Sequence, residues 1–190
     1  MHTQKRIAER THDAILDSAL EVFCRFGYDG TTTRAIAYKA KVNEVTLFRH
    51  FGSKKKLFQA IVDRDMDISQ VAAEIPPPHG EDPVEDLVRI GTYLSQNMQA
   101  RARVSNLLIT EGQRTGTKNV LQRLPTQGLV HLTPIFEKMG AKDPYIASVA
   151  FMSFLIRSVM FKQFLGEDPV VDLDEETIRR FSMMIAKGMR

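Results

Sequence analysis

One stretch, residues 31–56, constrains the fold of this chain more than any other. It reads TTTRAIAYKAKVNEVTLFRHFGSKKK, which predicts two short helices joined by a tight turn. Gly30 interrupts the segment before it, and Thr32 can cap the first helix through its hydroxyl group. Asn43 can cap the second helix, which we expect over residues 44–51.

The second helix of this pair has two different faces. Leu47, Phe48 and Phe51 are spaced to pack inward. The residues left on the outer face are Glu44, Val45, Thr46, Arg49 and His50. An apolar inner edge and an outer face of hydrogen-bonding side chains are what a helix needs to read base edges in the major groove of DNA.

The wider segment from Ile15 to Ile61 contains four linked submotifs: GYDGTT, IA..A.V, TLFRHF and SK..L. In sequence and spacing it resembles the DNA-binding domain of the TetR family of bacterial transcriptional regulators. It departs from the family pattern at Lys41, where the family usually has Gly in the turn, and at Val45, where it usually has a small residue. A non-Gly residue in a left-handed turn costs roughly 1 kcal/mol. Val45 is expected on the reading face, where it would alter which bases are preferred.

The resemblance also implies which side chains contact DNA. Thr32, Thr33, His50 and Lys54 hold the positions of the family's phosphate contacts, and Phe48 stands where the family has a tyrosine. Phe48 lacks the tyrosine hydroxyl, so one phosphate bond is expected to be missing. Arginine commonly reads guanine through two bonds, so Arg34 and Arg49 are candidates for base contacts. The remaining members of the implied set are Asn43, Glu44, Val45, Thr46 and Lys55.

Two of these residues have an alternative role. Glu44 can accept a hydrogen bond from cytosine or restrain Arg49. His50 can contact a phosphate or be a capped histidine of the protein surface. Three adjacent lysines on their own would indicate a solvated face, but here they follow the helix pair directly, which favours attraction to phosphates.

The charge of the chain is distributed unevenly. Its 190 residues carry a net charge of +3, yet residues 1–56 have eleven basic against six acidic residues and the remainder has fifteen against seventeen. This asymmetry favours an anionic partner for the N-terminal part.

Cys24 is the single cysteine, which excludes an intramolecular disulfide, and we expect it to be buried and inert. The N-terminus lacks a signal-peptide pattern and the apolar run 144–156 is too short to span a bilayer, so we expect a cytoplasmic protein.

The rest of the chain has helical periodicity, and we predict an all-α protein. An amphipathic helix from about Thr11 to Gly27 would complete a three-helix DNA-binding unit. A long helix should follow the lysines and stop at Pro76-Pro77-Pro78. Further helices are expected from Asp82-Pro83, over about 103–114, over 119–139 with a bend near Pro125 and Gly128, over 144–165, and after a cap at Asp172 or Asp174. The domains are predicted as residues 1–56, a helix-turn-helix DNA-binding domain, and residues 57–190, a helical effector-binding and dimerisation domain.

The helix over residues 146–164 is apolar around most of its circumference, which indicates a core helix or a subunit interface. In the TetR family the last two helices form a four-helix bundle across a two-fold axis, which implies a homodimer here. The implied interface residues are Phe151, Phe154, Leu155, Phe161, Phe181, Met184 and Ile185. Residues on the helices that the family uses for its effector are Tyr93, Asn97, Leu108, Glu111, His131 and Phe151.

The five histidines show no paired metal-ligand spacing, and no catalytic constellation or phosphate-binding glycine loop is present, so we expect no metal, no cofactor and no enzyme activity. The resemblance implies a repressor that binds a pseudo-palindromic operator in double-stranded DNA as a dimer. A small, largely apolar effector would release it. The alternatives are a helical ligand carrier or enzyme, or a protein-interaction adaptor, with an incidental helix-turn-helix.

Overall fold

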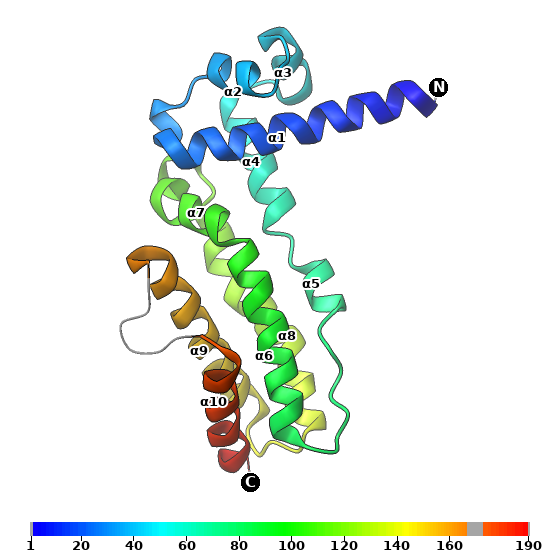
Figure 1. The fold of residues 1–190 in the computed structure, drawn as a ribbon, viewed down its shortest axis with the longest axis vertical. Helices are drawn as coiled ribbons and strands as arrows, with labels where there is room; N and C mark the ends of the chain where they lie inside the picture. Colours follow the sequence, from blue (N-terminus) through cyan, green and yellow to red (C-terminus); the bar gives the residue numbers. More distant parts are fainter. Residues whose placement is uncertain (1, 167–172, 190) are drawn as a thin grey trace. The chain divides into compact units, whose positions relative to one another are not determined.

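The structure is a computed structural model that describes residues 2–166 and 173–189. All regular structure in these residues is helical, which confirms the all-α prediction (Figure 1). The chain divides into two compact units, one made of Met1–Asp67 with Arg103–Leu121, the other of Ile68–Ala102 with Gln122–Arg190.

The N-terminal unit is built from α1 (His2–Gly30), α2 (Thr33–Lys39), α3 (Glu44–Phe51), α4 (Lys54–Asp65) and α7 (Ala102–Thr115). α1 packs against α2 and α4, and α3 packs against both of these helices. Their inward faces supply the core residues Ile15, Leu16, Ala19, Val22, Phe23, Ile36, Leu47, Leu57, Phe58 and Ile61. The predicted packing of a first helix across the helix-turn-helix pair is therefore confirmed.

α1 begins earlier than predicted, at His2 and not near Thr11. The predicted end at Gly27 is confirmed, because Gly27 has the non-helical angles φ 68° and ψ 178°, and a separate helical turn follows it within the range of α1. Phe26, the last apolar residue before Gly27, is exposed, and the Arg25 guanidinium lies 5.1 Å from its ring centre.

The predicted long helix after the lysines is wrong in its length. α4 ends at Asp65, and a separate short helix, α5, covers Ser69–Ala73. Aspartates at positions 63, 65 and 67 bring negative charge to the C-terminal end of α4, where the helix dipole disfavours it. The periodicity of the apolar residues gave no sign of this break.

The C-terminal unit contains α5, α6 (Pro83–Ala100), most of α8 (Lys118–Lys138), α9 (Pro144–Leu165) and α10 (Glu175–Gly188). α6 packs closely on α9 and α10. A Cβ atom added at Gly91 would lie only 2.9 Å from Ile178 and 3.0 Å from Phe151, so the glycine permits this approach. The core of the unit consists of Leu87, Ile90, Leu94, Leu132, Phe136, Phe151, Met152, Leu155 and Met189.

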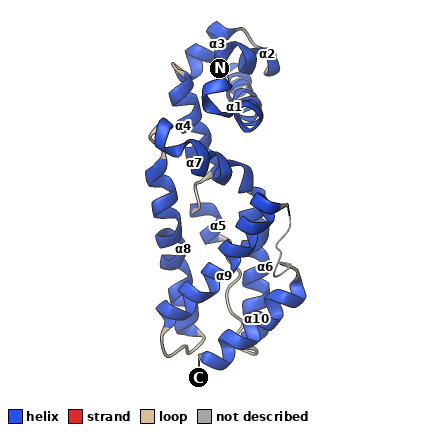
Figure 2. Cartoon of the chain, turned by 90° about the vertical axis from the view of Figure 1, so that its left-hand side faces the viewer, coloured by secondary structure: helices blue, strands red, loops and turns tan. Residues whose placement is uncertain are grey.

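The predicted helix starts of this unit are confirmed at three aspartates. Asp82, Asp143 and Asp174 each accept a hydrogen bond from a backbone N–H in the first turn of α6, α9 and α10. Asp172, the other candidate for the last cap, lies outside the described residues. A break near Pro125 and Gly128 is not found, because α8 is one continuous helix over Lys118–Lys138 (Figure 2).

The burial of side chains on α9 partly decides between the two roles predicted for this helix, a core helix or a subunit interface. Phe151 and Leu155 are completely buried within one chain, so they are core residues and have no surface to offer a partner. Phe154 stacks on Phe181 with ring centres 4.0 Å apart.

Among the described residues, Pro144–Gln163 also has the length and composition of a membrane span. One such helix is weak evidence for a membrane protein, because the core helix of a soluble protein has the same length and composition.

Candidate nucleic-acid interface

Three short helices of the N-terminal unit are each fixed by a side-chain cap. The Thr32 hydroxyl accepts from the Ala35 N–H at 3.1 Å, and the Asn43 side-chain carbonyl accepts from the Val45 N–H at 2.9 Å. Both caps confirm the predictions. Ser53 caps α4 in the same manner at 3.1 Å; it was missed, although a serine directly before a helical run is itself a capping signal.

Lys41 lies in the turn between α2 and α3, and its backbone is left-handed, with a φ of 55°. It is the only non-glycine residue with positive φ in the described part of the chain. Backbone hydrogen bonds from Lys41 N–H to Tyr38 C=O and from Val42 N–H to Ala37 C=O close the turn. Lys41 therefore occupies the strained position that glycine usually fills.

α3 presents an outer face close to the predicted one. Val45 is 73% exposed, and Arg49 is exposed beside it on the same helix. Leu47 and Phe51 are buried as expected, but Phe48 is 43% exposed. Adjacent residues of a helix point about 100° apart, so Phe48 cannot share the inward direction of Leu47.

Glu44 and Thr33 join the first turns of α3 and α2. The Thr33 hydroxyl donates to the Glu44 carboxylate at 2.5 Å, in a partly buried position. This contact differs from both roles weighed for Glu44, and a pair separated by eleven residues leaves no local signal in the sequence. It fixes the spacing between the two helices that carry the outer face, and Arg34 stands exposed next to Thr33 on α2.

Lys54 has a structural task in addition to the phosphate contact expected of it. Its ammonium group donates to the backbone carbonyls of Tyr28 and Thr31, at 2.8 and 2.9 Å, and lies 4.5 Å from the centre of the Tyr28 ring. An ammonium group has three donors, so these bonds leave one for another acceptor. Lys55 and Lys56 are exposed.

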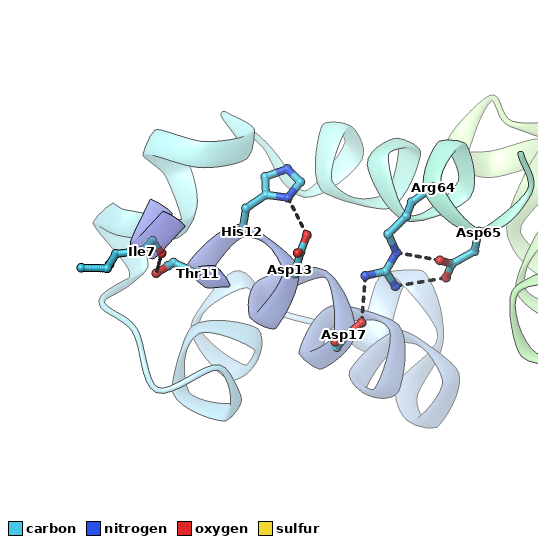
Figure 3. A network of polar contacts seen from close by, with 7 residues as sticks. All are labelled: Ile7, Thr11, His12, Asp13, Asp17, Arg64 and Asp65. Atoms are coloured by element: carbon cyan, nitrogen blue, oxygen red, sulfur yellow. Dashed lines mark hydrogen bonds and ion pairs between the residues drawn. The ribbon is translucent and has the colours of Figure 1, made fainter. Parts of the chain in front are cut away.

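His50 lies at the C-terminal end of α3 beside the His12 ring, 6.0 Å away between centres. The His12 ring also lies 4.7 Å from that of Phe51, so α1 contacts the end of α3 directly. Burial lowers the pKa of His50, and the nearby His12 and Arg49 lower it further. His12, which also approaches Asp13 at 3.4 Å, was not anticipated as part of this surface (Figure 3).

Several other cations of the N-terminal unit are neutralised by acidic partners. Lys39 pairs with Glu21 at 2.6 Å, which lowers the pKa of that carboxyl group through a hydrogen bond and its charge. Arg64 bridges Asp17 on α1 and Asp65 on α4 (Figure 3). Within the described residues Arg34, Arg49, Lys55 and Lys56 have no ion-pair partner. Unpaired positive charge is thus found on α2, α3 and the start of α4.

The predicted effector residues are divided between the two units of the chain. Leu108 and Glu111 lie in the N-terminal unit, whereas the other four lie in the C-terminal unit. There Phe151 is buried in the core, while His131 is exposed. The Tyr93 hydroxyl donates to the Val71 carbonyl at 3.0 Å, and the Asn97 amide donates to the Tyr93 carbonyl at 3.0 Å.

Cys24 was expected to be buried, and this is wrong: it is exposed on α1. It follows the buried residues Val22 and Phe23, and the rotation of the helix carries it to the outer side. No group of three or more His, Cys, Asp or Glu side chains in the described residues could hold a metal ion.

Comparison with known proteins identifies the family of this chain. Residues 15–61 match the family of bacterial regulatory proteins named after tetR. The chain is 34% identical over 186 residues to the transcriptional regulator TcmR of Streptomyces glaucescens, covering 98% of this chain and 72% of that protein. This chain belongs to the TetR family. The TetR-family resemblance is confirmed, and the chain is a DNA-binding transcriptional regulator.

Other relatives and solved structures agree with the assignment. The transcriptional repressor NicS of Pseudomonas putida is 28% identical over 140 residues, which cover 71% of this chain and 66% of NicS. A TetR-family structure from Mesorhizobium loti has a TM-score of 0.69 at 20% identity and covers 96% of both chains. The structure of AibR with isovaleryl coenzyme A and operator DNA has a TM-score of 0.58 at 21% identity, covering 94% of this chain and 98% of AibR. At 20% and 21% identity, the likeness to these two solved structures shows the fold.

Proposed function

We propose that this TetR-family regulator is a cytoplasmic repressor without enzyme activity, which binds a pseudo-palindromic operator as a homodimer and leaves it when a small, largely apolar effector binds. The observation that carries the proposal is the outer face of α2 and α3. Exposed Arg34, Val45 and Arg49 stand there on helices fixed by two caps and by the contact between Thr33 and Glu44. Such a rigid face with unpaired arginines suits the reading of base edges.

Repression and effector control are supported by the relatives. NicS is a repressor by name, and AibR was crystallised with both a coenzyme A thioester and operator DNA. We propose that residues 1–56 are the DNA-binding domain of this chain and residues 57–190 its effector-binding and dimerisation domain. A typical coupling of about 1–3 kcal/mol between effector and operator would weaken operator binding roughly 5- to 150-fold.

Homodimer formation is supported by apolar surface on the last two helices. Phe161 on α9 is 39% exposed and Met184 on α10 is 59% exposed, while Phe154, Phe181 and Ile185 are partly buried. Symmetric dimers are the commonest oligomers, and a two-fold axis would place two copies of α3 on a palindrome.

Selection from a randomised duplex pool tests the proposal. We expect the wild-type protein to select a palindromic site and Arg34→Ala to relax the preference at one symmetric position. Lys55→Ala is the matched control, since loss of a phosphate contact should weaken binding evenly over all sequences and reduce the salt slope by about 1. Binding that is uniform over sequence and vanishes with salt would contradict specific readout, and an operator affinity that no candidate effector changes would contradict the release step.

A further inference from the structure

α5 is held on the C-terminal unit more weakly than α6, which packs closely on α9 and α10. It spans only the five residues Ser69–Ala73, none of which is buried, and its N-cap residue Ile68 offers no side-chain hydrogen bond. A helix of this length is unstable in water without packing, and segments with few buried contacts open most easily. We therefore expect α5 to open while the rest of the unit stays folded.

Two half-buried apolar side chains and one polar bond hold this segment in place. Val71 and Ile75 pack against the core cluster of the C-terminal unit. The Tyr93 hydroxyl on α6 donates to the Val71 carbonyl at 3.0 Å, which gives a partner to a carbonyl near the end of a helix. The hydroxyl has a single hydrogen to donate, and the Glu74 carboxylate, 3.5 Å away, is an alternative acceptor. The hold of Tyr93 on α5 is thus one hydrogen bond between neutral groups.

The chain is fixed more firmly on either side of α5. Before it, Met66 is buried. After it, the Asp86 carboxylate accepts from the backbone N–H groups of His79 and Gly80, at 2.9 and 3.0 Å, and from Arg89 at 2.7 Å. Hydrogen bonds to ionised groups are about twice as strong as those between neutral groups. α5 is therefore a flap between two firm attachments, and it can lift without detaching.

The surface that the flap covers is apolar. The core cluster consists of apolar side chains, most of them from α6, α8 and α9, and lifting α5 exposes its edge where Val71 and Ile75 now pack. We propose that residues 68–75 are the gate through which the effector enters the C-terminal unit, and that the bond from Tyr93 to Val71 sets how often this gate is open. The inference rests on the proposed function, in which the effector is small and largely apolar.

Hydrogen exchange of the full-length protein without effector measures the opening. In the wild type, peptides from residues 68–75 should exchange well before those from residues 84–98. Tyr93→Phe should speed the exchange of residues 68–75 about 2- to 12-fold, the range that corresponds to one neutral hydrogen bond. Ile75→Ala, which weakens the packing of the flap and leaves Tyr93 in place, should act in the same direction. Tyr145→Phe, the same change at an exposed tyrosine of α9, should leave this exchange as it is in the wild type.

Stopped-flow binding of the apolar dye anilinonaphthalene sulfonate tests whether the opening admits a ligand. A ligand that binds only the open form associates in proportion to the population of that form. Tyr93→Phe and Ile75→Ala should therefore bind the dye faster by the same factors as their exchange, and Tyr145→Phe should bind it at the wild-type rate.

Three results would overturn the gate and leave operator recognition intact. They are unchanged exchange of residues 68–75 in both flap variants, equal dye association rates in all four proteins, and no dye binding by any of them. An operator affinity that no effector changes is a separate result, measured on DNA. It would overturn the release step of the proposed function and the gate with it.

Discussion

Lys54 holds the backbone where α1 gives way to α2, because its ammonium group bonds the carbonyls of Tyr28 and Thr31. Hydrogen bonds to charged groups contribute about 1.5–3 kcal/mol each. We expect Lys54→Met to lower the free energy of unfolding by about 2 kcal/mol, measured by urea denaturation. Lys55→Met is the matched control, and its stability should stay within about 0.5 kcal/mol of wild type because Lys55 is exposed. Equal stability of both variants would contradict the structural role of Lys54.

His50 makes stability depend on pH. Its pKa in the folded state lies below the ordinary value of 6.5, first because of burial and then because of His12 and Arg49. The unfolded chain therefore binds a proton at a pH where folded His50 is still neutral, so the free energy of unfolding falls as pH drops through 6.5 toward the folded pKa.

We expect His50→Gln to reduce this dependence, as measured by thermal unfolding between pH 5 and pH 8. His131→Gln, a change at an exposed histidine of the C-terminal unit, should leave the profile as it is in the wild type. A profile that His50→Gln does not alter would show that other groups cause the pH dependence.

At the scale of elements, the turn between α2 and α3 carries strain at Lys41. Lys41→Gly should raise the free energy of unfolding by up to about 1 kcal/mol, because glycine adopts positive φ without a steric penalty. The greater freedom of glycine in the unfolded chain offsets part of this gain. Lys41→Ala removes the same charge but keeps the strain, so an equal gain in both variants would point to charge instead of backbone conformation.

The packing of α6 against α9 and α10 depends on the absence of a side chain at Gly91. Gly91→Ala places a methyl group within 3.0 Å of Ile178 and Phe151, and we expect a loss of about 1–3 kcal/mol in the free energy of unfolding. The control is Gly188→Ala on α10, where a Cβ atom would meet nothing within 4 Å. A neutral result at Gly91 would mean that the three helices can separate slightly at no cost.

How far the sequence predicts these elements depends on how local their causes are. Thr32, Asn43 and Asp143 act on backbone groups two or three residues away, so their caps could be predicted from adjacent letters. The bonds from Lys54 to residues 26 and 23 positions earlier could not, because they exist only after α1 and α4 pack.

The candidate site divides in the same way. The outward direction of Val45 and Arg49 follows from helical periodicity, and their place in the DNA interface follows from the family motif. The neighbourhood of His50 could not be predicted in this way, because the His12 ring reaches it only after α1 has packed against the end of α3. The exposure of Cys24 and Phe48 shows that a residue beside a buried neighbour is often turned away from it.

For the molecule as a whole, the proposed dimer depends on the apolar side chains that one chain leaves exposed on α9 and α10. We expect Met184→Glu to weaken self-association at least tenfold, measured by sedimentation equilibrium, because a buried unpaired carboxylate is costly. Ile7→Glu, at an apolar residue of the N-terminal unit that is equally exposed, should leave self-association unchanged. Equal effects of both changes would place the interface elsewhere.

The exposed Cys24 has a practical consequence for such a dimer. As the single cysteine of the sequence, it gives each chain one attachment point for a spin label, on the helix that underlies the DNA-binding unit. A labelled homodimer would contain one pair of labels, and pulsed electron resonance would report the distance between them. The native sequence thus allows the distance between the two DNA-binding units of a dimer to be measured with and without operator or effector.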